Sequence, residues 1–469
     1  MNAYFVWTIG CQMNYADSWR LEQELRRLGY REASRPEKAN LVVLNTCVVR
    51  QRAEDKCVGR LTSLKGWKQR YPEGLLAVMG CFVGDTETLR RTYPYVDLFL
   101  RPSETMGLVH YLCDHDLLPA DRLPSDARPH ETWHEPWDEV PVSMHVPISR
   151  GCDHRCTYCI VRLRRGPERS RSIREVVCEI GSLVRRGVRE VTLLGQNVDS
   201  YGRDLPPLPG KGRPPHLADL LYTIHEVEGL YRIRFLTSYP ADLRPDVIKA
   251  AASLRRVCPH FELPVQAGDD QVLRRMGRNY TVAQYRDLIA RIRERVSGCS
   301  VATDVIVGFP GESEAQYEAT YRLLEELRFD AVHVAAYSER PGTPAARLRD
   351  DVPLAEKERR RKAIDDLQAR IVGEINAQLM GQIVEVLVEE KRRAPHGGTG
   401  RWGGRTPTNK LVFFADEEDD WRGKLAHVRV TWTGPWSMIG EVIEHDPNRK
   451  ALPGTTPRPG AASKASSSY

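Results

Sequence analysis

The stretch RGCDHRCTYC, residues 150–159, decides how the central part of this chain folds. It carries Cys152, Cys156 and Cys159 in the spacing CxxxCxxC, directly after an apolar segment that predicts a β-strand. Three thiolates can hold a cluster of four irons and leave one iron without a protein ligand, open to a small molecule. A structural zinc ion normally takes four ligands, and His154 is a candidate fourth.

The residues that follow alternate between strand-like and helix-like segments. Strand candidates lie at residues 145–149, 190–194, 232–237, 260–265, 301–307 and 331–337. Helical patterns separate them, for example at 173–186, 282–296 and 314–327. Six consecutive β/α units predict a partial (β/α)6 barrel or a full barrel over residues 142–375, with its chemistry at the C-terminal ends of the strands. This setting favours an iron-sulfur cluster over a zinc knuckle.

The first 113 residues show the same alternation on a smaller scale. Apolar runs at 3–9, 41–44 and 75–79 enclose helical patterns, and this βαβαβ order predicts an α/β unit with a doubly wound parallel sheet. Cys11, Cys47 and Cys81 each follow one of the runs. Because the C-terminal ends of parallel strands converge on one crevice, the three thiols are candidate metal ligands. The alternative is that they are small buried apolar side chains.

The other cysteines fit neither triad, and we interpret them as structural: Cys57, Cys113, Cys178, Cys258 and Cys299. Two of them, Cys57 and Cys178, fall in predicted helices, away from the strand ends. In a reducing compartment, metal binding or burial is a more common fate for cysteine than a disulfide.

Composition marks the remaining boundaries. Residues 114–141 are rich in proline and acidic residues and predict a linker. A charged helix at about 354–379 leads to four strand candidates, at 383–389, 410–414, 425–432 and 438–444. These predict a small all-β barrel or sandwich over residues 380–445. The tail, 446–469, is rich in proline, glycine, alanine and serine and predicts disorder.

Positive charge gathers in two places. One run follows the cysteine stretch and comprises Arg162, Arg164, Arg165, Arg169, Arg171 and Arg174. The other, residues 391–410, contains no acidic residue and supplies the candidate RNA contacts Arg392, Arg393, Arg401, Trp402, Arg405 and Lys410. Cations beside an aromatic ring suit RNA phosphates and stacked bases. The alternative for either run is an ordinary solvated surface.

Glycine and polar turns follow two of the barrel strands. Gly195, Gln196 and Asn197 come after the second strand, and Gly308 comes after the fifth. Glycine allows a ligand to approach the backbone closely, so these four residues are candidate cofactor contacts. Turns between strands and helices favour glycine in any barrel, which is the plainer interpretation.

CxxxCxxC after the first strand of such a barrel resembles the radical S-adenosylmethionine (SAM) superfamily. The resemblance implies that Cys152, Cys156 and Cys159 hold a catalytic 4Fe-4S cluster, whose open iron binds the amino and carboxylate groups of SAM. It also implies that Tyr158, just before the last cysteine, lies against the adenine of SAM. A packing role for Tyr158 is the alternative.

The strand-end cysteines, the barrel and the small β unit together resemble the methylthiotransferases, over nearly the whole chain. In that family the three N-terminal cysteines hold a second 4Fe-4S cluster that handles sulfur, and the C-terminal unit is an RNA-binding TRAM domain. GCQMN at 10–14, LLGQNVDSYG at 193–202 and GRTPTNKLVFF at 404–414 resemble the MiaB type of this family. Leu163 and Arg164 depart from the proline and aromatic residue usual there. Local substrate contacts therefore stay open.

The MiaB type acts on isopentenyladenosine next to the anticodon of tRNA, and the resemblance implies insertion of a methylthio group at carbon 2 of that base. The implied cofactors are two 4Fe-4S clusters and SAM. That carbon is not acidic enough for base chemistry, which agrees with a sequence that offers no isolated His/Asp/Glu constellation. Alternatives within the family are threonylcarbamoyl adenosine or a ribosomal protein as substrate. An alternative of another class is a zinc-dependent RNA-binding scaffold.

The implied partners are the anticodon stem-loop of tRNA and an electron donor such as flavodoxin or ferredoxin. We expect a monomer with no membrane contact. No basic residue precedes Arg20, so a secretory signal is not expected, and the apolar run near residues 75–84 is too short to span a bilayer. We therefore expect a cytoplasmic location.

Overall fold

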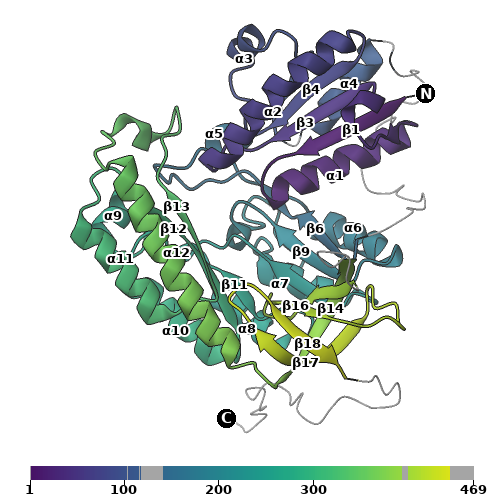
Figure 1. The fold of residues 1–469 in the computed structure, drawn as a ribbon. Coiled ribbons are helices and arrows are strands. Elements are labelled where there is room, and N and C mark those ends of the chain that lie inside the picture. Colours follow the sequence, from purple (N-terminus) through teal and green to yellow (C-terminus); the bar gives the residue numbers. More distant parts are fainter. Residues whose placement is uncertain (1, 103, 116, 118–140, 393–399, 444–469) are drawn as a thin grey trace.

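The computed structural model describes residues 2–102, 104–115, 117, 141–392 and 400–443. Within them the chain forms three units in sequence order: an N-terminal α/β unit, a central half-open barrel and a C-terminal β-barrel (Figure 1). The linker predicted for 114–141 and the tail predicted for 446–469 lie almost entirely outside the described residues. No described helix has the length and apolar character needed to cross a membrane.

The N-terminal unit is a parallel sheet covered by helices on both faces. Its strand order is β2-β1-β3-β4-β5: Ala3–Thr8 (β1), Arg31–Glu32 (β2), Leu41–Thr46 (β3), Leu75–Gly80 (β4) and Leu98–Leu100 (β5). The helices are Gln12–Arg27 (α1), Gln51–Arg70 (α2), Thr86–Thr92 (α3) and Thr105–Asp114 (α4), with a 3-10 turn at Pro36–Lys38 (η1). The sequence predicted the doubly wound sheet and its three central strands. Both edge strands were missed, because two or three residues show no readable period.

Each face of this sheet buries its own hydrophobic core. On one face Leu21 and Leu25 of α1 pack with Leu108 of α4 against the central strands. On the other, Leu61 and Trp67 of α2 pack against the strands. Strands β3 and β4 are therefore completely buried, which is why they read as continuous apolar runs in the sequence, whereas most residues of β1 are partly exposed.

The central unit contains the six predicted strands. They are Ser143–Pro147 (β6), Glu190–Leu194 (β9), Arg232–Phe235 (β10), His260–Glu262 (β11), Ser300–Val307 (β12) and Ala331–Ala336 (β13). They form two parallel sheets, β10-β9-β6 and β11-β12-β13, joined by a single bridge between Ile233 and Val257. A small hairpin, Ser149–Arg150 (β7) with Arg169–Ser170 (β8), follows the first strand. β10 ends sooner than predicted, at a turn where Thr237 has φ 68°.

Helices alternate with these strands on the outside of the barrel. Their bounds are Val161–Arg165 (α5), Ile173–Arg185 (α6), Leu217–His225 (α7), Pro245–Ser253 (α8), Asp270–Arg275 (α9), Val282–Arg295 (α10), Glu314–Leu327 (α11) and Leu354–Ala377 (α12). Short 3-10 turns occur at Val198–Ser200 (η3) and Pro344–Arg347 (η4). Four of these helices begin with a capping box, for example Ser172 with Glu175 in α6, which fixes where each helix starts.

The C-terminal unit is a closed five-stranded barrel. Its strands are Ile383–Arg392 (β14), Arg401–Arg405 (β15), Leu411–Phe414 (β16), Leu425–Thr433 (β17) and Met438–Val442 (β18). The sequence predicted four of them and missed β15, whose residues Gly403 and Gly404 weaken any strand pattern. A Cβ on Gly404 would lie 2.2 Å from the carbonyl oxygen of Leu387, so glycine is required where the two backbones meet.

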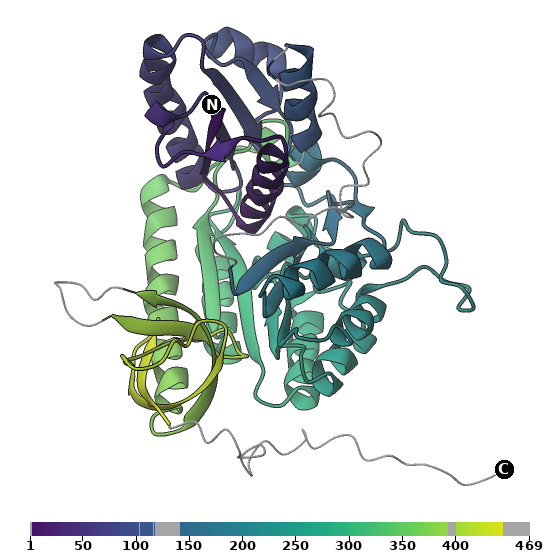
Figure 2. The same cartoon turned by 90° about the vertical axis from the view of Figure 1, so that its right-hand side faces the viewer.

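The two outer units contact opposite ends of the central barrel (Figure 2). The C-terminal barrel contacts residues at the N-terminal ends of the strands: Arg232 pairs with Glu385 at 2.8 Å, and Lys410 pairs with Asp330 at 2.9 Å. The N-terminal unit sits on the C-terminal ends, where Leu194 packs against Met13 of α1. The N-terminal unit therefore covers the C-terminal ends of the barrel strands, and we call it the roof of the barrel.

One buried arginine holds the C-terminal barrel in place. Arg234 pairs with Glu190 at 3.0 Å, and both side chains are almost fully buried. It also donates hydrogen bonds to the carbonyl oxygens of Pro407 (2.9 Å) and Thr406 (2.6 Å), which lie just before β16. The guanidinium thus pairs with one buried carboxylate of its own unit and donates hydrogen bonds to two carbonyl oxygens of the C-terminal barrel.

We predict that Arg234→Ala loosens the barrel from the core. Removing one partner of a buried pair costs about 3–5 kcal/mol, because the other charge stays buried. A non-specific protease should then cleave the connection between residues 377 and 383 roughly 100 to 5,000 times faster, since cleavage follows the population of the opened form. The control is Arg244→Ala, whose pair with Asp246 is half exposed and is worth about 1 kcal/mol or less. Equal cleavage rates for the two variants would contradict this role.

Candidate active site

The loop that carries CxxxCxxC is fixed at both ends by the barrel. It leaves the β7–β8 hairpin through Gly151, which has φ 77° and whose Cβ would lie 2.0 Å from the Pro167 carbonyl oxygen. Cys152 N donates to the Gly166 carbonyl at 3.2 Å. Thr157 N donates to the Met276 carbonyl at 2.9 Å, just after α9. The three cysteines are therefore presented on a rigid loop at the C-terminal end of the first strand.

The surroundings of these thiols suit a cluster rather than free cysteine. All three are partly exposed and form no disulfide. Burial raises the pKa of Cys152 to about 11 and that of Cys159 to about 12, so the thiolates need a neighbouring positive charge. One such charge is present, because the buried guanidinium of Arg278 donates to Cys156 Sγ at 3.5 Å. Iron in a cluster would supply more, and three thiolates fit a cluster with one open iron.

The candidate SAM contacts that follow the second barrel strand lie against the loop of the first triad. Gln196 Oε1 accepts a hydrogen bond from Gly151 N at 2.6 Å, and Asn197 Nδ2 lies 3.2 Å from His154 Nε2. A Cβ on Gly195 would lie 2.6 Å from Ser149 Oγ, so glycine is needed for close packing. All three residues support the cysteine loop. Whether they also contact SAM stays a prediction.

His154, the candidate fourth zinc ligand, is engaged elsewhere. Its Nε2 lies 2.6 Å from Asp242 Oδ2, and its ring stacks on Tyr239 with the centroids 3.7 Å apart. Asn197 Nδ2 donates to the same carboxylate at 2.7 Å. In the part of the chain that the structure describes, no three His, Cys, Asp or Glu side chains are grouped around a single metal position. His154 therefore positions the loop through Asp242.

Gly308 and Tyr158 occupy different surroundings. A Cβ on Gly308 would lie 2.3 Å from Lys357 Cγ of α12, so close helix packing already explains glycine at this position. Tyr158 packs against the barrel core, and burial raises its pKa well above the ordinary value. The proposed contacts of both residues with SAM stay predictions.

The second triad forms at the C-terminal edge of the N-terminal sheet. Cys11 caps α1 directly after β1, Cys47 follows β3 and Cys81 follows β4. A hydrogen bond from Cys47 lowers the pKa of Cys11 to about 6, and both Cys47 and Cys81 are buried. Because the C-terminal ends of parallel strands meet at one edge of the sheet, three cysteines that are about 35 residues apart in the sequence come together. A small group of sulfur donors on rigid strand ends suits an iron-sulfur cluster.

An amide network holds the Cys11 turn. Asn14 Oδ1 accepts from Cys11 Sγ at 3.3 Å, while its Nδ2 donates to the Thr46 carbonyl at 2.8 Å and to Asn45 Oδ1 at 3.0 Å. Asn14 and Asn45 are fully buried. The network ties the end of β1 to the end of β3, and so fixes Cys11 relative to Cys47.

The two triads face one another across the interface between the units. Ile160, the residue after Cys159, packs against Val48 and Cys81. Arg165 of α5 pairs with Asp17 of α1 at 3.1 Å, with exposed fractions of 3% and 2%, and its guanidinium also hydrogen-bonds Cys81. The loop of the first triad is thus anchored to the second.

One expectation about the remaining cysteines is wrong. Cys57 was placed away from the strand ends, but its Sγ lies 3.7 Å from the Cys47 carbonyl oxygen, under the second triad. Helix α2 turns back over the sheet and carries Cys57 to the end of β3. Its thiol is buried, and burial raises its pKa to about 11. Cys57 is thus a buried structural neighbour of the second triad.

The candidate RNA contacts of the C-terminal barrel differ in accessibility. Trp402 is buried in the barrel core, and its Nε1 donates to the Asp416 carbonyl at 3.2 Å. Lys410 pairs with Asp330, and Arg405 lies 3.8 Å from Glu389. Arg392 and Arg401 are exposed, whereas Arg393 lies outside the described residues. Because a buried ring cannot stack on a base, Trp402 is not an RNA contact in this conformation.

Three family descriptions match successive parts of the chain. Residues 3–101 match the Uncharacterized protein family UPF0004, residues 146–324 match the Radical SAM superfamily, and residues 377–443 match the TRAM domain. Among solved structures, the radical SAM methyltransferase TsrM from Kitasatospora setae covers 74% of this chain and 74% of its own, with a TM-score of 0.52 and 13% identity. At that identity the likeness shows a shared fold.

Curated relatives match along most of their length. The tRNA-2-methylthio-N(6)-dimethylallyladenosine synthase of Roseiflexus sp. (strain RS-1) is 47% identical, over 94% of this chain and 90% of its own length. Proteins of the same name from Herpetosiphon aurantiacus and Dehalococcoides mccartyi (strain CBDB1) are 46% and 45% identical, over 94% of this chain and 98% and 99% of theirs. This chain is a radical SAM enzyme that belongs to the tRNA-2-methylthio-N(6)-dimethylallyladenosine synthase family.

Proposed function

We propose that this chain inserts a methylthio group at carbon 2 of N6-dimethylallyladenosine next to the anticodon of tRNA, using SAM and two 4Fe-4S clusters. One observation carries the proposal: two cysteine triads, one at the barrel mouth and one on the roof above it, meet across the interface that Arg165 bridges. A single-cluster enzyme has no need of the second triad. The names of the relatives supply the substrate.

The chain's own residues hold and shield the reacting groups. Cys152, Cys156 and Cys159 would hold the cluster that binds SAM, and Cys11, Cys47 and Cys81 would hold the cluster that handles sulfur. When bound, the first cluster with SAM supplies the radical reactivity that an unactivated carbon-hydrogen bond requires. The protein's task is then positioning and exclusion of water.

Positioning comes from contacts already in place. Gln196 and Asn197 fix the loop of the first triad through Gly151 and through the His154–Asp242 pair. Arg278 donates a hydrogen bond to Cys156 Sγ at 3.5 Å and so holds that side chain in place. The N-terminal unit packs on the mouth of the barrel through apolar contacts with Ile160 and Leu194.

The proposal also includes a source of electrons and a state of assembly. An external one-electron donor such as flavodoxin or ferredoxin would reduce the cluster, and the chain would work as a monomer. In the C-terminal barrel we propose Arg392 and Arg401 for tRNA contact, because both side chains are exposed. Arg392 also pairs with Glu390 at 2.6 Å, so a phosphate would compete with that carboxylate.

The first test separates the two triads. Replacing Cys11, Cys47 or Cys81 by alanine should remove roughly half of the iron and abolish methylthiolation, while SAM is still cleaved to 5′-deoxyadenosine, since only the second cluster is lost. Cys57→Ala, a buried neighbour of the same triad, should retain full iron. Iron analysis of anaerobically purified protein and quantification of 5′-deoxyadenosine are the measurements. Full methylthiolation by all three variants would refute the two-cluster proposal.

The second test identifies the substrate. The chain should be expressed in a bacterial host that lacks its own enzyme of this kind, and the tRNA nucleosides should be analysed by mass spectrometry. We expect N6-dimethylallyladenosine to be converted to its 2-methylthio derivative, and a Cys152→Ala variant to leave it unconverted. A methylthio derivative of threonylcarbamoyl adenosine in place of this product would assign a different substrate.

A further inference from the structure

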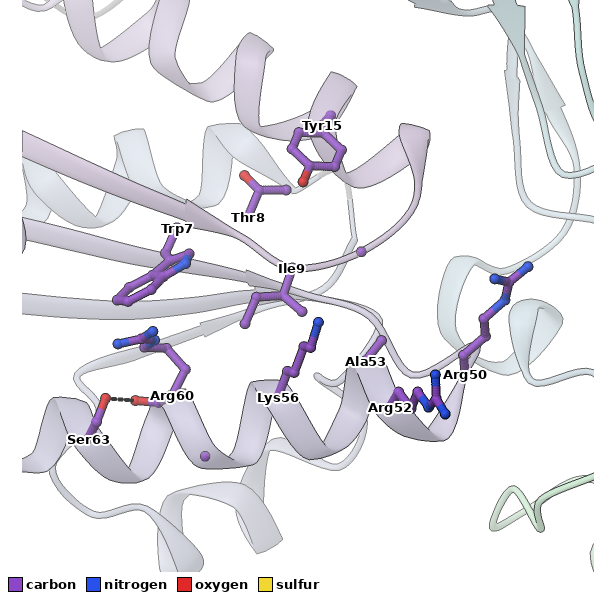
Figure 3. A pocket seen from close by; sticks show the side chains of 12 residues that line it. Trp7, Thr8, Ile9, Tyr15, Arg50, Arg52, Ala53, Lys56, Arg60 and Ser63 are labelled. Atoms are coloured by element: carbon purple, nitrogen blue, oxygen red, sulfur yellow. Dashed lines mark hydrogen bonds between the residues drawn. The ribbon is translucent and has the colours of Figure 1, made fainter. Parts of the chain in front are cut away.

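A cationic pocket in the N-terminal unit has no part in the chemistry described above. It lies between the end of β1 and helix α2, and its volume is about 860 Å³ (Figure 3). Four cations line it, together with two aromatic rings: Arg50, Arg52, Lys56, Arg60, Trp7 and Tyr15. None of the twelve lining residues that the structure describes is acidic. The pocket therefore suits an anion that carries, or lies next to, a flat ring.

The charge of this pocket is built by the helix. Arg52, Lys56 and Arg60 recur every four residues and so share one face of α2. The acidic residues of the same helix are occupied elsewhere: Glu54 pairs with Arg340, and Asp55 accepts a hydrogen bond from Gln51. Positive charge is thus left concentrated on the face that borders the pocket.

Few contacts within the protein neutralise these cations. Arg50 lies 3.7 Å from Asp304 of β12, and its side chain is 59% exposed. Arg60 stacks over Trp7, with its guanidinium carbon 3.0 Å from the ring centroid. Among the described residues Lys56 and Arg52 form no ion pair, although the charge of Arg52 acts on Asp365 of α12. Figure 3 shows Lys56 extending from α2 toward Ile9. An anionic ligand would supply the missing partner.

The pocket lies where ligands bind in this type of sheet. In the order β2-β1-β3-β4-β5, the connections from β1 and β3 run in opposite directions, which leaves a crevice at their C-terminal ends. Trp7, Thr8, Ile9 and Gly10 at the end of β1 form one wall. The next residue is Cys11, so the pocket borders the second triad.

The C-terminal barrel cannot provide phosphate contacts at this place. It docks near Arg232, Ser300 and Asp330, at the N-terminal ends of the strands. Both triads lie at the other end, and the eight residues of β12 alone span roughly 25 Å at about 3.3 Å per residue. RNA that reaches the triads therefore needs a second set of cations near the mouth.

We propose that this pocket binds backbone phosphates of the substrate RNA next to the adenosine that is modified. Arg52, Lys56 and Arg60 contact the phosphates, and Tyr15, which is 54% exposed, offers its ring to a neighbouring base. Arg50 links the pocket to the barrel wall through Asp304. This inference rests on the proposed tRNA substrate. It identifies the residues that bind the RNA backbone beside the second triad.

The test is a salt titration of RNA affinity with the full-length, cluster-loaded protein. The ligand is an anticodon stem-loop RNA that carries N6-dimethylallyladenosine. In the double variant Arg52→Gln with Lys56→Gln, each lost phosphate contact should lower the log-log salt slope by roughly 0.7 to 0.9. The slope should fall by roughly 1.4 to 1.8, which corresponds to roughly 20-fold weaker binding at 0.15 M salt.

The matched control is Lys65→Gln with Arg70→Gln. It removes the same charge from the same helix, outside the pocket, and should keep the wild-type slope. Lys56→Arg, which preserves the charge, should also keep that slope. Iron content of each variant checks that the protein is folded and loaded. Equal slopes for the pocket variant and the control would overturn the proposal.

Two further outcomes are decisive. If the pocket variant loses binding of AMP or inorganic phosphate, measured by calorimetry, while its RNA slope stays at the wild-type value, the pocket is a site for a free phosphate ligand and the RNA proposal is wrong. If the wild-type protein itself fails to bind or methylthiolate the RNA, the proposed function fails. The two failures are therefore distinguishable.

Discussion

The arrangement of the active site depends on one buried ion pair, between Arg165 and Asp17. It joins the helix after the first cysteine triad to the helix that begins at Cys11, with both side chains almost fully out of water. The same guanidinium hydrogen-bonds Cys81. Because breaking a buried pair costs about 3–5 kcal/mol, the roof is held on the barrel by electrostatics as well as by packing. Its position decides how the two cysteine triads face one another.

Both triads were predictable because their placement follows from backbone rules. Cys152, Cys156 and Cys159 are close in sequence, and Cys11, Cys47 and Cys81 each follow a parallel strand of one sheet, so topology alone brings the latter together. The six barrel strands were recognisable because short strand-like segments alternate regularly with helical patterns along the sequence. Gln196 and Asn197 were predicted as SAM contacts, which stays a prediction; the partners that the structure gives them, Gly151 and Asp242, lie on other elements.

What the sequence did not reveal depends on long-range contacts. Trp402 reads like an RNA-stacking ring beside arginines, yet strand β15, hidden by two glycines, turns it into the barrel core. Lys410 reads as a free cation, and Asp330, eighty residues away, pairs with it. Cys57 looked remote from any site until α2 folded back over β3. In each case the partner comes from another element, and no local pattern encodes it.

The distribution of charge follows from the polarity of the barrel. Its strands all run the same way, so chemistry gathers at one end and leaves the other free for docking a further unit. The C-terminal barrel docks at that free end, where Arg234, Arg232 and Lys410 form ion pairs. Because these three cations are already paired, they are not free to bind a ligand. The cations that border the second triad then come from the N-terminal unit itself. Helix α2 supplies them, because its acidic residues are turned toward Arg340 and Gln51 and its basic face is left open beside Cys11.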